Sequence, residues 1–112
     1  MAGERMRRVD EAVRQVLADA LAGELADPRV GFVTVTDVKT SPDLRAARVF
    51  VSVLGDETAR ADTLAGLRSA HGVLQGVIAG QLHLKRTPTL EFVYDSTTDR
   101  ALRVETLLRE RA

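Results

Sequence analysis

Ala70, His71 and Gly72 are the residues whose types and spacing best fit a chemical task, the holding of a phosphate or a sugar. They interrupt an apolar helical pattern over residues 64–86, which carries glycine at 66, 72, 76 and 80. A nucleic-acid backbone can approach a glycine closely, and a helix beginning near Gly72 would point free N–H groups at a phosphate. The alternative is that Gly72 only relieves strain in helix packing. Both interpretations predict a break in the helix here, because Gly72 can take backbone angles that other residues resist.

Three of these glycines, Gly72, Gly76 and Gly80, are spaced by four residues. At that spacing they share one helix face, which has no side chains. Such a face can admit an RNA backbone, or it can lie close against a sheet. Small residues at this spacing usually mean close packing, so we expect close packing here.

The charged residues balance, with 16 basic and 16 acidic side chains, so a basic surface requires their segregation in space. All but two of the basic residues are arginine, which pairs with phosphate through two parallel hydrogen bonds. Acidic residues interrupt the N-terminal arginine cluster, so a solvated helix face is its alternative role. Besides the three residues at the break, our candidate RNA contacts are Arg5, Arg7, Arg8, Arg29, Lys39, Arg45, Arg68, Gln75, Lys85 and Arg86.

Catalysis and metal binding find little support in the sequence. The chain has no cysteine, and His71 and His83, its two histidines, lack a second ligand at metal spacing. No nucleophile motif or phosphate-binding glycine loop is present. We therefore predict no catalytic residue, no metal and no cofactor.

Membrane insertion and secretion are not indicated either. No apolar run approaches the roughly 20 residues of a membrane span, and the charged N-terminus is not followed by an apolar signal core. We expect a cytoplasmic protein. The four aromatic residues, Phe32, Phe50, Phe92 and Tyr94, fall on predicted strands, and we expect them to fill the core rather than stack on bases.

The elements that position these residues follow from the apolar periodicity. It predicts a helix over 5–26, strands over 32–39 and 46–54 that pair antiparallel, and helices over 57–84 with the break at 70–72. A strand over 89–95 and a last helix follow. This order predicts a single α+β domain over residues 1–112, with residues 1–4 flexible and a three-stranded sheet covered on one face by helices.

The same order, with two helices meeting at a break before the last strand, resembles a type II KH domain. The resemblance becomes more specific at residues 27–31 (DPRVG), at Ala70-His71-Gly72, and at Pro88, Leu90 and Phe92 followed by residues 94–96 (YDS). Together these features resemble the ribosome-binding factor A family of bacteria, over residues 5 to about 108.

The resemblance implies a non-enzymatic role in ribosome biogenesis. It implies binding to the immature small (30S) ribosomal subunit and its 16S rRNA. It also implies help in late maturation, including 5′-end processing done by other proteins, during growth in the cold. We expect a monomer when the chain is free. The alternative is a protein–protein interaction module of α+β type without RNA binding, which the zero net charge favours.

Overall fold

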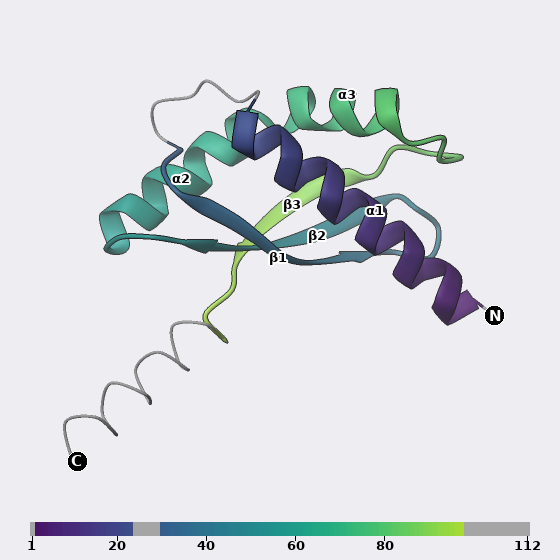
Figure 1. Cartoon of the computed structure of the whole chain (residues 1–112), viewed down its shortest axis with the longest axis horizontal. Helices are drawn as coiled ribbons and strands as arrows, with labels where there is room; N and C mark the ends of the chain where they lie inside the picture. The colour runs from purple at the N-terminus through teal and green to yellow at the C-terminus, as the bar shows by residue number, and fades with distance from the viewer. Residues whose placement is uncertain (1, 24–29, 98–112) are drawn as a thin grey trace, which may run out of the picture.

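The helices and strands follow one another in the predicted order, in a computed structural model that describes residues 2–23 and 30–97. The elements are α1 (Ala2–Gly23), β1 (Val33–Thr40), β2 (Ala46–Val53), α2 (Glu57–Ser69), α3 (His71–Gln81) and β3 (Thr89–Tyr94). The three helices lie on one face of the sheet, as predicted (Figure 1). The predicted last helix falls outside the described residues.

The sheet has the strand order β1-β2-β3 and is mixed. β1 and β2 pair antiparallel, which confirms the predicted hairpin, whereas β3 lies parallel to β2. A parallel neighbour requires a crossover connection, and α2 with α3 supplies it. The described elements share one hydrophobic core, to which the sheet contributes Val49, Val51 and Phe92.

The first helix begins at Ala2, so residues 2–4, which the sequence left outside it, form its first turn. Its apolar stripe faces the core, with Val13, Leu17 and Ala20 buried at helical spacing. Because α1 crosses the sheet over its full length (Figure 1), its opposite face remains open to solvent.

A β-bulge at Thr36 explains why the apolar alternation of the first strand is incomplete. Val35 pairs with Val51 and Asp37 pairs with Phe50, so Thr36 is the extra residue. The bulge shifts the alternation by one position, and Val35 and Val38 therefore both face the core. The Thr36 hydroxyl donates a hydrogen bond of 2.7 Å to Oδ2 of Asp95, which follows β3.

This hydrogen bond predicts a pH effect. Together with the bonds from Thr97, it holds the pKa of the Asp95 carboxyl below its ordinary value of 3.8. A depressed folded pKa contributes stability that is complete above the ordinary pKa and is lost as the pH falls through the folded pKa. Replacing Thr36 with valine is expected to lower the unfolding free energy near neutral pH and to shrink its decline below about pH 5.

Urea titrations at a series of pH values test this expectation. The control is Thr34→Val, the same substitution at an exposed position of the same strand. If the unfolding free energy of the two variants fell by the same amount between neutral and acid pH, the role given to the Thr36 hydroxyl would be contradicted.

The break between α2 and α3 occurs where the sequence predicts it, but not for the predicted reason. Ala70 is the non-helical residue, with φ of −90° and ψ of 5°. Its N–H donates to the carbonyls of Gly66 and Leu67, at 3.0 and 3.1 Å, which tightens the last turn of α2. Among the described glycines only Gly55 has a positive φ, so Gly72 lies in α3 as an ordinary helical residue.

Gly55 is required by the turn that enters α2. Its φ is +128°, and a Cβ at this position would lie 2.7 Å from the Cβ of Ala59. The next residue, Asp56, caps α2 by accepting a hydrogen bond of 2.9 Å from the Ala59 N–H.

Replacing Gly55 with alanine is therefore expected to lower the unfolding free energy by about 1–3 kcal/mol. The matched control is Gly80→Ala, because no described atom lies within 4 Å of a Cβ there and α3 gains a better helix former. Urea unfolding should rank Gly80→Ala at or above the native chain. The same loss in both variants would show that Gly55 has no special role.

The aromatic residues divide between the core and the surface. Phe92 is 2% exposed, which confirms its predicted core position. Phe32 is 81% exposed, so the prediction was wrong for this residue. It lies just before β1, at the end of the hairpin, and its carbonyl accepts a hydrogen bond from the N–H of Leu54, which is also exposed.

Candidate nucleic-acid interface

The solvent-facing side of α3 has no side chain larger than a methyl group at four of its positions. Gly72, Gly76, Ala79 and Gly80 are exposed, and no described atom lies within 4 Å of a Cβ built on any of these glycines. The expectation of close packing was therefore wrong. The core-facing residues of α3 are Leu74 and Ile78, which lie two positions away from the glycines and so on the opposite side.

The first turn of α3 offers hydrogen-bond donors at one end of this glycine-lined face, beside the exposed Val73. Within the described part of the chain, no side chain caps its N–H groups and no acidic residue stands in the turn. A helix N-terminus of this kind attracts anions, because its N–H groups and dipole both favour negative charge. The arrangement that the sequence predicted for a phosphate is therefore present in the backbone.

The residues around the break have different environments. Ala70 is 8% exposed and packs in the core, so its side chain is not available to a ligand. His71 is exposed, and its Nδ1 lies 2.9 Å from the carbonyl oxygen of Arg68. Because a carbonyl only accepts, Nδ1 carries the proton, and Nε2 remains for another partner.

Two further candidates form hydrogen bonds to the backbone. Nη2 of Arg68 lies 3.4 Å from the Phe92 carbonyl, at the edge of the sheet, and the residue is exposed to solvent. Nε2 of Gln75 donates to the Pro88 carbonyl at 2.9 Å and is half-buried. Gln75 thus fastens α3 to the segment that leads into β3, a role that no pattern in the sequence indicated.

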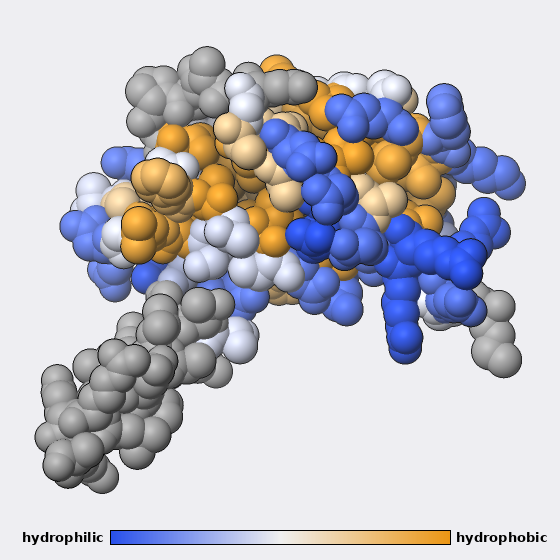
Figure 2. Space-filling view, in the orientation of Figure 1, coloured by the Kyte–Doolittle hydropathy of each residue, from blue (hydrophilic) through white to orange (hydrophobic). Residues whose placement is uncertain are grey.

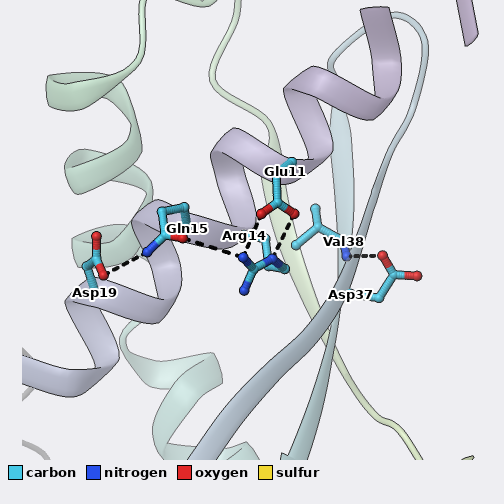
Figure 3. A network of polar contacts seen from close by, with 6 residues as sticks. All are labelled: Glu11, Arg14, Gln15, Asp19, Asp37 and Val38. Atoms are coloured by element: carbon cyan, nitrogen blue, oxygen red, sulfur yellow. Dashed lines mark hydrogen bonds and ion pairs between the residues drawn. The ribbon is translucent and has the colours of Figure 1, made fainter. Parts of the chain in front are cut away.

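Two of the four arginines of α1 are paired with acids of the same helix. Hydrophilic side chains gather along the visible side of α1 (Figure 2). Figure 3 shows Arg14 against Glu11, with Nη2 and Nε at 2.6 and 2.8 Å from the two carboxylate oxygens. This guanidinium holds the pKa of the Glu11 carboxyl below its usual range. Arg8 pairs with Glu4 at 3.1 Å in the same way. The solvated-face alternative fits Arg8 and Arg14 well.

Two cations of the hairpin, Lys39 in β1 and Arg45 in the turn before β2, also lie beside acids. Nζ of Lys39 is 3.7 Å from Asp37, and Nε of Arg45 is 3.5 Å from Asp43, in both cases at exposed positions. Exposed pairs of this kind are worth about 0–1 kcal/mol and release the cation readily. Arg29 lies outside the described residues.

The remaining candidates do not combine into one basic face. Arg5, Lys85 and Arg86 line one groove, beside the N-terminal turns of α1. Arg7 lies with Lys39 at a smaller hollow between α1 and β1, which Asp10, Glu11 and Asp37 also line. Arg68 and His71 stand apart from both sets, at the break. The fold therefore separates the candidates into three groups.

The described residues show neither a metal-binding cluster nor a membrane-spanning helix. These ranges contain no group of three or more histidine, aspartate or glutamate side chains that would hold a metal ion. None of the described helices is both long and apolar enough to cross a bilayer.

Comparison with known proteins shows the family of the chain. The family model described as ribosome-binding factor A matches residues 5–108. The chain belongs to the ribosome-binding factor A family. A ribosome-binding factor A from Anaeromyxobacter sp. (strain K) is 52% identical over 107 residues, which cover 95% of this chain and 78% of that protein. The resemblance noted in the sequence is thereby confirmed.

Solved structures of the family share the fold. A solution structure of a Thermotoga maritima protein, described as a putative ribosome-binding factor A, is 35% identical, with a TM-score of 0.72. The match covers 80% of this chain and 85% of that one. A homology model of the Thermus thermophilus factor, fitted into a cryo-EM map of a 30S–RbfA complex, is 28% identical in sequence, with a TM-score of 0.62. That match covers 77% of this chain and 90% of the other. The α+β, KH-like architecture is therefore that of the family.

Proposed function

We propose that this chain binds the immature small ribosomal subunit, contacts its 16S rRNA and assists late maturation, including 5′-end processing carried out by other proteins. Its membership of the ribosome-binding factor A family supports this proposal. So does the Thermus thermophilus relative, whose coordinates were fitted into a map of a 30S complex. The proposal places the protein in the cytoplasm of a bacterium, as a monomer when free, with a role during growth in the cold.

The observation that carries the RNA contact is the exposed face of α3. A phosphate at the first turn of α3 would accept hydrogen bonds from its uncapped N–H groups, beside Nε2 of His71. The glycines that follow let the sugar–phosphate backbone lie directly against the helix. Arg68 stands at the same end of α3 and supplies positive charge.

Binding of this kind requires no cofactor to act. A protein that binds one arrangement of the RNA and not its competitors shifts the population toward that arrangement by mass action. The protein would hold the competent arrangement while other factors act on the RNA.

Co-sedimentation with small ribosomal subunits over a range of salt concentrations tests the proposal. If about five phosphates are contacted, the logarithm of the binding constant should fall with the logarithm of salt concentration with a slope of about −4. Large subunits serve as the control and should retain little of the chain. Failure to pellet with small subunits at any salt concentration, or a flat salt response, would contradict the proposal.

A further inference from the structure

A groove of about 940 Å³ lies at the opposite end of α3 from the break. Three segments that are distant in sequence form its walls: the N-terminal turns of α1, the turn between β1 and β2, and residues 83–86 after α3. Figure 2 shows this region as an apolar area between the hydrophilic residues of α1 and those at the tip of the loop that follows α3. None of its described lining residues belongs to α3, whose exposed face is proposed for RNA.

The floor of the groove is aliphatic. Met6, Val9, Leu44 and Leu84 are half-buried there, and Pro42 adds an exposed ring. No phenylalanine, tyrosine or tryptophan lines the groove within the described ranges, and the one aromatic ring in its lining is that of His83, which is exposed. Covering such partly exposed apolar side chains with a partner removes them from water, which favours binding.

Leu44 occupies its position at a conformational cost. Its φ is +61°, in the left-handed region that leucine rarely adopts. Hydrogen bonds within the turn hold it there, including one of 2.8 Å from the Leu44 N–H to the Ser41 carbonyl. Glycine would adopt this conformation without strain but would remove part of the apolar floor.

The rim of the groove carries surplus positive charge. Arg5, Lys85 and Arg86 are exposed and form no ion pair with any described residue. The one acid in the lining, Asp43, is already engaged. It accepts hydrogen bonds from the Ser41 hydroxyl at 2.7 Å and the Arg45 N–H at 3.0 Å. An occupant of this groove must therefore bring negative charge together with apolar surface.

We propose that the groove binds an acidic segment of a partner protein, which places an aliphatic or aromatic side chain on the floor and carboxylates against the rim cations. Bidentate pairing with carboxylates suits Arg5 and Arg86 in particular. Unstacked RNA bases are instead usually held on aromatic rings or guanidinium planes. The half-buried floor of this groove is aliphatic, whereas the His83 ring and the rim arginines are exposed. The proposal goes beyond the RNA contact of α3 and does not depend on it.

The chain's own C-terminal segment is a poor match in charge. Residues 98–112 contain four arginines and three acidic residues, so they would add positive charge to a rim that is already positive. None of the groove's described lining residues belongs to the first turn of α3, so a protein segment in the groove would leave that turn open to a phosphate.

A phage-displayed library of random peptides, selected on the full chain, tests this proposal. The selected sequences are expected to combine aspartate or glutamate with leucine, isoleucine, methionine or phenylalanine. The best peptide is then labelled, and its affinity is measured by fluorescence anisotropy. The double variant M6S/L84S is expected to weaken binding by roughly tenfold or more, as loss of a central apolar contact does. The rim variant K85E/R86E should do the same.

The control is Val73→Ser, which removes an apolar side chain that is 65% exposed but lies beside the break. It should bind the peptide as the native chain does. Circular dichroism checks folding, and if M6S/L84S unfolds, the single variant M6S replaces it. No enrichment, enriched peptides without acidic residues, or equal affinity for floor and control variants would each overturn the proposal.

An oligouridylate serves as the RNA arm of the experiment. The variant M6S/L84S, which changes no charge, should retain the native affinity for the oligouridylate, because the face of α3 is unchanged. If the floor variant lost RNA while its peptide affinity stayed native, the groove would belong to RNA and the proposal would fall. Because M6S/L84S leaves the α3 face intact, a negative result for peptide binding can be told apart from a negative result for RNA binding.

Discussion

Replacing Phe92 with alanine is expected to lower the unfolding free energy by about 3–5 kcal/mol, the largest stability effect that we predict for one side chain. Phe92 is among the largest fully buried side chains of the described core. It lies in β3, the edge strand that pairs with β2, and its ring is on the face that the helices cover. Alanine would remove the ring and leave a cavity that a β-strand has little freedom to close. Domains of this size are stable by only about 5–15 kcal/mol in total.

Phe32→Ala is the matched control, because it is the same substitution at a side chain that is 81% exposed. It should change the unfolding free energy by no more than about 0.5 kcal/mol. Urea unfolding of both variants, with the slope compared to the native chain, separates a core effect from a change in the unfolded state. Similar losses in the two variants would contradict the burial that the structure assigns to these residues.

Replacing Gly72 with aspartate is expected to weaken binding to the small ribosomal subunit by about tenfold or more without lowering stability. A carboxylate in the first turn of α3 would repel a phosphate and compete for the uncapped N–H groups. The same carboxylate favours the helix, since negative charge near a helix N-terminus stabilises it by about 0.3–1 kcal/mol. No described atom lies within 4 Å of a Cβ at this position, so the side chain meets no obstacle.

This opposition between binding and stability makes the substitution informative. Gly72→Ala is the control, since it adds a side chain without charge and should retain most of the binding. Affinity by co-sedimentation and stability by urea unfolding are measured on the same preparations. If Gly72→Asp bound small subunits as the native chain does, the first turn of α3 would not be a phosphate site.

Local patterns predicted the element order and most boundaries to within a few residues. Alternating β-branched residues marked β1 and β2, and the apolar stripe marked α1. The bulge at Thr36 was visible only as an imperfect alternation, because its partner Asp95 is 59 residues away. The exposure of Phe32 depends on how far the helices extend over the hairpin. A local sequence pattern does not predict this extent.

The candidate site was predictable in part. Glycines at intervals of four defined one face of α3, but whether the sheet or solvent meets that face depends on the opposite side, where Leu74 and Ile78 pack. The pairing of Arg8 with Glu4 follows from their spacing in a helix. The groove does not, since the fold alone brings Arg5 beside residues 83–86.

Crosslinking from the exposed face of α3 tests the central claim most directly. The chain has no cysteine, so a single A79C substitution gives a unique attachment point for a photoreactive group on that face. T34C places the same group on the opposite face of the sheet. Bound to small ribosomal subunits, the first is expected to crosslink to 16S rRNA and the second to give little or none. Crosslinks to rRNA from position 34 alone would contradict the proposed RNA contact through α3.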